Sequence, residues 1–200
     1  KAQNIDLSRL LAPIEAVEGV ALFTCEAQDH GLEKALDNEL IVKARDAIDG
    51  GAPVSFESSI RNINRTVGAM MSGEIAKQHG HAGLSEDSIH VKFTGDAGQS
   101  FGAWLSHGVS FELVGDANDY VGKGLSGGRI AIYPSPDSQL VPEKNIIVGN
   151  TVLYGAIAGE CYFRGVAGER FAVRNSGASA VVEGCGDHGA EYMTGGVVAV

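Results

Sequence analysis

A glycine-rich stretch around one lysine is the first place where this sequence could do chemistry. "GKGLSGG" (122–128) could cradle a phosphate, because the backbone N–H groups of glycine-rich loops bind phosphate oxygens. It does not fit G-x-x-x-x-G-K-S/T, since the lysine comes too early and no Ser or Thr follows it. The spacing G-x-G-x-x-G also occurs, but it should open a helix, and the following "RIAIYP" is typical of a strand that ends at proline. We therefore interpret these glycines as turn residues and not as a nucleotide site.

Histidine occurs in two patterns that could support catalysis or metal binding. The triplet Asp-His-Gly at 29–31 and again at 187–189 pairs an imidazole with a carboxylate, which could orient a general base. Adjacent strand residues point to opposite faces, however, and Asp beside Gly is common in turns, so a turn is the favoured interpretation. "HGHAG" (79–83) holds two histidines without a third ligand nearby in the sequence, which disfavours a metal site.

Acidic residues and cysteines also have two interpretations each. The cluster "DANDY" (116–120) could bind a cation, but a polar corner of a repeat explains it more simply. Cys25, Cys161 and Cys185 lie in apolar runs or corners, where buried, inert thiols are the default. Three cysteines cannot all pair and none forms C-x-x-C, so we expect a reduced, cytoplasmic protein. These patterns predict no catalytic, cofactor-binding or metal-binding residue.

Composition argues against several partners. The 200 residues are 44% hydrophobic and 20% charged, which gives enough apolar surface for a sizeable core. The formal net charge of -10 argues against a nucleic-acid groove. No apolar run reaches the roughly 18 residues of a membrane span, and the opening "KAQNIDLSRL" lacks the form of a signal peptide. We therefore expect neither nucleic acid nor a membrane as a partner.

Helix and strand signals alternate in the first half of the chain. Residues 30–49 place leucine, isoleucine and alanine at helical spacing, with charged residues on the opposite face and Gly50-Gly51 to stop the helix. "VSFESSIRNI" (54–63) alternates apolar and polar residues, as a strand does. A short helix ended by Gly80 is predicted in "RTVGAMMSGEIAKQHG" (65–80).

Glycine is distributed unevenly along the chain, and the glycine-rich half follows a different structural pattern from the first half. Of 28 glycines, eight lie in residues 1–94 and twenty in residues 95–200. From Ile89 onward, short apolar runs are bounded by Gly, Asn or Asp, and no segment between them is long enough for a crossover helix, which disfavours a doubly wound sheet. These runs are "IHVKF", "VSFELV", "RIAIY", "NIIVGNTVLY", "ECYF", "RFAV", "SAVVE" and "GGVVAV".

The glycine-rich half also repeats itself. "LYGAIAGECYFRGVAGE" (153–169) aligns with "VRNSGASAVVEGCGDHG" (173–189) at an offset of about 19 to 20 residues, with Cys161 near Val181. Such a period with short strands is typical of a solenoid, here a parallel β-helix. Glycines at its corners allow positive φ or the close approach of neighbouring turns. The predicted corner glycines are Gly155, Gly159, Gly165, Gly168, Gly177, Gly184 and Gly186.

Four longer stretches resemble a known family. They are "DHGLEKALDNELI" (29–41), "NRTVGAMMSGEIAKQHG" (64–80), "GDAGQSFGAWLSHGVSFELVGDANDYVGKGLSGGRI" (95–130) and "NTVLYGAIAGECYFRGVAGERFAVRNSGASAVVEGCGDHGAEYMTGG" (150–196). Together they closely resemble the C-terminal glycine-motif (GXGXG) domain of the glutamate synthase large subunit. The resemblance implies a mainly β fold, a right-handed parallel β-helix with a short α-helical N-terminal part.

The same resemblance implies a structural role without catalysis by this domain. In that family an amidotransferase domain releases ammonia from glutamine, and a barrel domain with FMN and an iron–sulfur cluster makes glutamate from 2-oxoglutarate. Their functional residues do not map here, since residue 1 is Lys and the cysteines are scattered. The expected partners are the other domains of the large subunit and a small reductase subunit. The alternative is another glycine-motif β-helix, of the formylmethanofuran dehydrogenase subunit type or free-standing.

We expect residues 1–200 to form a single domain. Residues 1–88 would supply a mixed helix and strand part with the first coil and, at 31–49, a cap, and residues 89–200 would form the glycine-rich coils. The family's sequence starts further upstream and usually continues beyond "GGVVAV", so we expect a piece of a longer polypeptide.

Overall fold

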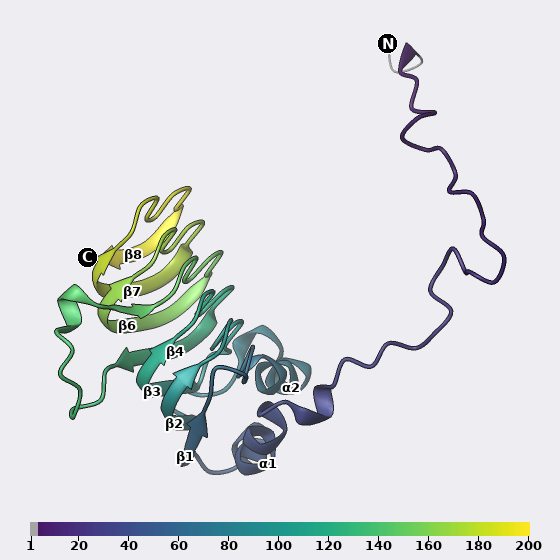
Figure 1. Ribbon diagram of the computed structural model, residues 1–200. Coiled ribbons are helices and arrows are strands. Elements are labelled where there is room, and N and C mark those ends of the chain that lie inside the picture. The colour runs from purple at the N-terminus through teal and green to yellow at the C-terminus, as the bar shows by residue number, and fades with distance from the viewer. Residues whose placement is uncertain (1–3) are drawn as a thin grey trace. The chain divides into compact units, whose positions relative to one another are not determined.

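The structure of this protein is a computed structural model that describes residues 4–200. The chain divides into two units, Lys1–Leu32 and Glu33–Val200, and each is described by itself. In the first unit, residues 4–31 form turns and bends but neither an α-helix nor a strand. The α-helices and strands of Figure 1 belong to the second unit. The expectation of a single domain over 1–200, with parts 1–88 and 89–200, stays a prediction.

The second unit combines two α-helices with one parallel sheet. The helices are α1 (Asp37–Ile48) and α2 (Ala69–His79), and the chain also has the short 3-10 helices η2 (Leu32–Lys34), η3 (Gly80–Ala82) and η4 (Pro142–Lys144). The strands are β1 (Val54–Ile60), β2 (Ile89–Ala97), β3 (Val109–Ala117), β4 (Ser126–Tyr133), β5 (Ile146–Val148), β6 (Ala158–Ala167), β7 (Ser176–Cys185) and β8 (Gly195–Ala199). The sheet order is β1-β2-β3-β4-β6-β7-β8, with β5 beside β3 and β6, and every pair is parallel. The prediction of a mainly β fold with a short helical part is confirmed.

The two predicted helices form, but one is shorter than expected. α2 ends at His79 with Gly80 as its C-cap, as predicted. The helix expected over 30–49 begins only at Asp37. Gly31 has a φ of 61°, outside the helical range, and Leu32 is exposed. Because most helical stability comes from burying an apolar face, this first stretch gains little from becoming a helix.

The strands repeat with the predicted period, but in a slightly different register. β6 and β7 pair at an offset of 19 residues, which places Cys161 beside Ala180 and Tyr162 beside Val181. The sequence alignment placed Cys161 near Val181, and its partner in the sheet, Ala180, is one residue away. A shift of one residue moves a side chain to the other face of a sheet. Cys161 and Ala180 are indeed buried together, whereas Tyr162 and Val181 are exposed.

Alternate residues of the strands build the core. In β2, Ile89, Val91 and Phe93 are buried. The Phe93 ring lies 5.3 Å from the ring of Phe101 and 5.0 Å from that of Phe111, measured between centroids. Removing such apolar surface from water is the main stabilising contribution to folding. Because parallel neighbours place inward residues side by side, the core continues from strand to strand along the sheet.

One repeat carries an insertion. Arg129 of β4 pairs with Glu160 of β6, an offset of 31 residues where β6 and β7 have 19. The added residues include the loop 134–145, which contains η4 and extends away from the strands in Figure 1. β4 and β6 nevertheless pair directly, so the insertion leaves the strand order intact.

Candidate functional site

Each repeat contains a turn with left-handed backbone at alternate residues. The first left-handed position, with φ from 57° to 63°, is Thr66, Ser100, Tyr120, Thr151, Arg170 and His188. The second, with φ from 55° to 98°, is Gly68, Gly102, Gly122, Leu153, Ala172 and Ala190. A third, with φ from 54° to 65°, is Trp104, Gly124, Gly155, Arg174 and Tyr192. We call residues 66–68, 100–104, 120–124, 151–155, 170–174 and 188–192 the turn ladder.

Hydrogen bonds between repeats hold the turn ladder together. The N–H group at the first position donates to the following repeat, as Ser100 does to the Asp119 carbonyl oxygen at 2.8 Å. The N–H group at the second position donates to the preceding repeat, as Gly102 does to the Val67 carbonyl oxygen at 2.9 Å. The N–H groups of the first and second left-handed positions thus point toward opposite neighbouring repeats. The turns are paired by backbone hydrogen bonds much as the strands are.

Asp37 takes the place of the missing neighbour at the β1 end of the turn ladder. Gly68, at the second position of the first turn, donates its N–H to Asp37 Oδ1 at 2.7 Å. Asp37 Oδ2 accepts the N–H groups of Met70 at 2.7 Å and Met71 at 3.2 Å. The buried carboxylate therefore caps both the ladder and the N-terminus of α2, where negative charge is favourable. Burial raises the pKa of Asp37, and the three N–H groups act in the opposite direction.

Most left-handed positions were not predicted from the sequence, because the prediction of corners relied on glycine. Of the thirteen non-glycine residues with positive φ within residues 4–200, all but Asp87 lie in the turn ladder. The short apolar run "RFAV" (170–173) is one of these turns, and so is the second half of "NIIVGNTVLY". Phe171, Ala172 and Val173 are all buried. Their apolar character therefore indicates that they lie in the core, and it does not indicate a strand. Only their spacing from the preceding turn could have identified them.

The seven predicted corner glycines fall into two groups. Those with positive φ are Gly155 (65°), Gly159 (107°) and Gly165 (146°). The others face close neighbours: a Cβ would meet Asn150 Oδ1 at Gly168, the Ile157 carbonyl oxygen at Gly177, Val166 Cγ2 at Gly184 and Glu169 Oε1 at Gly186. Of the seven, Gly155 alone belongs to the turn ladder. The structural role assigned to this set stays a prediction.

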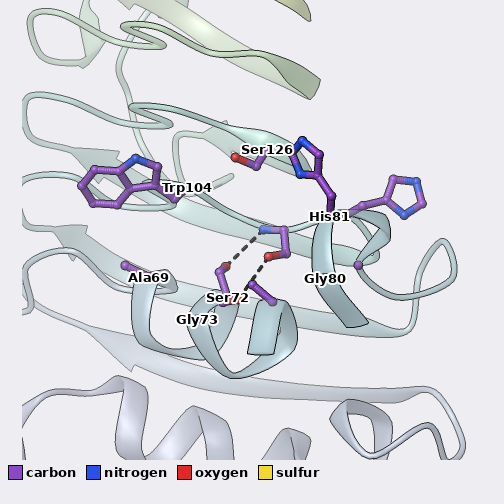
Figure 2. Close-up of a pocket in the computed structure, with 11 residues that line it drawn as sticks. Ala69, Ser72, Gly73, Gly80, His81, Trp104 and Ser126 are labelled. Carbon is purple, nitrogen blue, oxygen red and sulfur yellow. Dashed lines mark hydrogen bonds between the residues drawn. The ribbon is translucent and has the colours of Figure 1, made fainter. Parts of the chain in front are cut away.

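A groove of about 310 Å³ lies beside α2 and the turn ladder, as Figure 2 shows. One wall is formed by small residues of α2, among them Ala69 and Gly73. Trp104, from the third left-handed position, and His81 lie on opposite sides of the groove. Trp104 is 49% exposed although its neighbours in sequence are buried. The indole lies against Gly124 of the next turn, where a Cβ would come within 2.6 Å of the ring.

The serines and one histidine of the groove are held by bonds within the fold. The Ser106 N–H donates to Ser72 Oγ at 3.1 Å, and Ser106 Oγ donates to the Ser72 carbonyl oxygen at 3.3 Å (Figure 2). His107 Nδ1 lies 2.7 Å from the Leu84 carbonyl oxygen. Because a carbonyl only accepts, Nδ1 carries the proton, which leaves Nε2 of the neutral ring as an acceptor. These bonds tie Ser106 to α2 through Ser72.

The glycine-rich stretch 122–128 is a turn followed by a strand, as predicted. Gly122 and Gly124 occupy left-handed positions of the turn ladder, and β4 begins at Ser126. Lys123 Nζ lies 5.6 Å from the ring centroids of both Trp104 and Tyr120. A phosphate loop requires a helix at this point, and the chain has a strand there instead.

Both Asp-His-Gly triplets are turns, which confirms the favoured interpretation. Asp29 Oδ1 accepts the N–H of Gly31 at 2.8 Å, the pattern of a turn that Asp often initiates. His188 occupies the first left-handed position of the last turn, and its Nδ1 lies 3.0 Å from Glu191 Oε1 on the surface.

The histidines of "HGHAG" do not converge on one site. His79 Nε2 donates to the Ile48 carbonyl oxygen at 2.7 Å, whereas His81 lines the groove beside α2. Over the described residues 4–200, no group of three or more His, Cys, Asp or Glu side chains is placed to hold a metal ion.

The acidic cluster "DANDY" is part of a corner between repeats. Asp116 of β3 pairs in register with Asp96 of β2, and partial burial together with the Asp96 charge raises the pKa of Asp116. Asp119 Oδ1 accepts the backbone N–H of Asn150, in the next turn, at 2.7 Å. The cluster therefore links neighbouring repeats, as the corner interpretation requires.

The cysteines differ in their surroundings. Cys161 is fully buried, and burial raises the pKa of its thiol far above the usual range. Cys185 is partly buried, and all three thiols are free. The expectation of a buried thiol is wrong for Cys25, which is exposed. The apolar run that contains it belongs to the first unit, whose Phe23 is also exposed, so its hydrophobicity does not report a core.

A comparison with known protein families bears directly on the repeats and the turn ladder. The family described as "GXGXG motif" matches residues 37–200. This chain belongs to the GXGXG motif family. The match begins at Asp37, the first residue of α1, and covers the sheet and the turn ladder.

Relatives of this GXGXG chain are glutamate synthases. Glutamate synthase (NADH) of Schizosaccharomyces pombe is 53% identical over 201 residues, which cover 100% of this chain and 10% of the relative. The glutamate synthase (NADPH) large chain of Bacillus subtilis is 49% identical, over 100% of this chain and 13% of the relative. Ferredoxin-dependent glutamate synthase 2 of Synechocystis sp. is 45% identical, over 100% of this chain and 13% of the relative. The chain thus spans about a tenth of the length of these curated relatives.

The expected resemblance to the glycine-motif domain of glutamate synthase is confirmed by the family and by these relatives. Residues 1–36 lie outside the match to the GXGXG family but inside the match to the glutamate synthases. Among residues 4–200, no helix combines the length and the apolar character that crossing a membrane requires.

Proposed function

We propose that this GXGXG chain is the structural, non-catalytic glycine-motif domain of a glutamate synthase large chain. The observation that carries the proposal is the 53% identity to a glutamate synthase along the whole chain. The names of the relatives specify three electron donors, NADH, NADPH and ferredoxin, yet all three match this chain at 45% identity or more. A domain retained across different donors fits a role independent of the donor.

The chemistry would then lie elsewhere in the longer polypeptide. An amidotransferase part would release ammonia from glutamine, and a part carrying FMN and an iron–sulfur cluster would convert 2-oxoglutarate to glutamate. Those parts, and a small reductase subunit, are the proposed partners. The cytoplasmic location expected from the unpaired cysteines belongs to the same proposal.

We further propose that the second unit is a right-handed parallel β-helix. Two observations support this fold: seven strands pair in parallel in a single order, and the turn ladder adds a second row of backbone bonds between the same repeats. An experimental structure of the full-length enzyme tests the handedness, and a left-handed winding or a flat open sheet would overturn this part of the proposal.

The proposed role is to hold the catalytic parts at a fixed separation. Each repeat is bonded to its neighbours through both strands and turns, so bending the stack would break two rows of hydrogen bonds. Side chains add to this stiffness. Arg129 donates to Glu86, Asp87 and Glu160 at 2.9, 3.0 and 3.1 Å, which ties β4 to β6 and to the loop before β2.

Two measurements test the proposed function. The 200-residue protein should be colourless and should turn over neither glutamine nor 2-oxoglutarate, and a flavin spectrum that survives gel filtration would contradict this expectation. In a full-length large chain, deletion of residues 95–200 should leave part of the glutamine hydrolysis and abolish coupled glutamate formation. Unchanged coupled turnover would show that the domain has no mechanical role.

A further inference from the structure

Residues 10–23 expose more apolar surface than a soluble segment normally does, and we call them the apolar strap. Its large apolar side chains are each between 58% and 83% exposed, namely Leu10, Leu11, Ile14, Val17, Val20, Leu22 and Phe23. Single exposed apolar residues are common on protein surfaces, but a contiguous set marks an interaction site.

The apolar strap has no regular structure of its own. Its backbone hydrogen bonds close single turns, from the N–H groups of Leu10 and Leu11 to the Leu7 carbonyl oxygen and from Val20 to Val17. Gly19 has a φ of 81°. Segments that stay unfolded in solution are poor in large apolar residues, and the strap is rich in them. Its composition therefore fits a segment that is ordered by burial against another surface.

The comparisons indicate where that surface lies. The strap lies outside the part of the chain that matches the GXGXG family, which begins at residue 37. It lies inside the match to the glutamate synthases, which extends over 100% of this chain but only 10–13% of theirs. The strap therefore accompanies the long large chains and is not a component of the glycine-motif repeats.

We propose that the apolar strap docks into an apolar groove on the part of a glutamate synthase large chain that lies outside these 200 residues. This inference rests on the proposed function. The charged residues of the strap are Glu15 and Glu18, which lie between Ile14, Val17 and Val20. The complementary groove accordingly carries Lys or Arg at its rim beside pockets for branched side chains.

Hydrogen exchange of the strap tests the proposal directly. Exchange of the amides of residues 10–23 is followed by mass spectrometry in the 200-residue protein and in the full-length large chain that contains it. We expect exchange within seconds in the shorter protein and at least tenfold slower exchange in the full-length chain. Equally fast exchange in both proteins would overturn the proposal. Equal protection in both, with sedimentation showing a dimer of the 200-residue protein, would overturn it in favour of a second copy.

Substitutions show whether the apolar side chains themselves are responsible. L10D and F23D should leave the thermal midpoint of the 200-residue protein unchanged, because both side chains are exposed there. In the full-length chain they should restore fast exchange of the strap and reduce coupled glutamate formation at least tenfold. The control Q28D introduces the same charge at an exposed polar residue of the same unit and should change neither. Protection of the strap that survives L10D and F23D would overturn the docking proposal.

The failure of this proposal can be distinguished from failure of the proposed function. If the unmodified full-length chain forms glutamate from glutamine and 2-oxoglutarate while its strap exchanges freely, only the docking proposal is wrong. If the full-length chain lacks that activity, the proposed function is wrong, whatever the exchange of the strap.

Discussion

The two halves of the turn ladder reach the same backbone conformation with different residues. The second left-handed position is glycine in the first three turns, with φ of 66° at Gly102 and 62° at Gly122. In the last three turns it is Leu153, Ala172 and Ala190, with φ of 59°, 56° and 55°. A left-handed residue other than glycine costs roughly 1–2 kcal/mol. The hydrogen bonds between repeats therefore impose this conformation, and glycine is not its cause.

Packing explains why glycine is nevertheless retained in the earlier turns. A Cβ on Gly122 would lie 2.7 Å from Leu153 Cδ2, and one on Gly102 would collide with Ile130 Cδ1. Leu153 stands at the equivalent position one repeat later and extends over Gly122. Glycine thus makes room for the larger side chain of the neighbouring repeat.

Removal of the cap at the β1 end should have the largest effect. If hydrogen bonds impose the turn conformation, Asp37→Ala leaves three N–H groups without their buried acceptor and should lower the free energy of unfolding by about 3 kcal/mol or more. Urea titration of the 200-residue protein measures this loss. Glu39→Ala, an exposed position on the same helix, is the matched control and should change stability by less than about 0.5 kcal/mol. Equal stability of the two variants would contradict the capping role.

Adding one methyl group to a glycine of the turn ladder should have the second-largest effect on stability. Gly122→Ala should cost about 1–3 kcal/mol, because the new Cβ overpacks against Leu153. In the Leu153→Ala background the same change should cost clearly less, since the colliding atoms are gone. Urea titrations of the two single variants and the double variant complete the cycle. Strictly additive losses would show that φ, and not packing, selects glycine at this position.

Adding a glycine to a turn that lacks one should have a smaller effect on the free energy of unfolding. Unlike most substitutions, it should not destabilise the protein. Arg170→Gly relieves a left-handed φ of 60° and keeps the N–H bond to Asp187, so it should leave the free energy of unfolding unchanged or raise it by up to about 1 kcal/mol. Arg164→Gly, at an exposed position of β6, should instead lose about 0.5–1 kcal/mol. Thermal unfolding of both variants measures whether glycine affects stability differently at the two sites. A similar loss at the two sites would mean that the turn carries no strain.

The smallest effect should come from the acidic pair just before the turns. Asp96 and Asp116 lie side by side here, where the later repeats pair Val166 with Gly184. Partial burial and the Asp96 charge raise the pKa of Asp116 above 3.8, so the folded state favours its protonated form. This contribution to stability is fully present below pH 3.8 and is lost as the pH rises through the folded-state pKa. Asp116→Asn should therefore be slightly more stable than wild type at pH 7, with the difference vanishing near pH 3. A stability difference that does not change with pH would contradict this assignment.

Local patterns predicted those parts of the molecule that local chemistry determines. The strand at 54–60, the helix end at Gly80 and the turn-then-strand at 122–128 follow from alternation, a C-terminal glycine and a proline-ended apolar run. The repeat period was also visible, because residues at the same place in each repeat face the same neighbours. The family resemblance then linked these elements to a single architecture.

Features that depend on distant partners were not predictable in this way. Nothing near Asp37 in the sequence indicates that its carboxylate accepts bonds from Gly68, Met70 and Met71. The left-handed conformation of Thr151 or Arg170 likewise arises from bonds to the following repeat. The groove beside α2 combines residues from α2 with Trp104 of a turn, so no single motif describes it.

The loop 134–145 has a practical consequence for anyone who wishes to modify this domain. Strand pairing between β4 and β6, and the turn bonds from 120–124 to 151–155, keep their pattern although the loop lengthens that repeat. The number of residues between β4 and β6 therefore does not determine how the neighbouring repeats pair. Asp137, in an exposed turn of the loop, marks a fusion point for a fluorescent domain or an epitope. For the same reason, evolution can add a new surface to this repeat by an insertion in the loop without changing the other repeats.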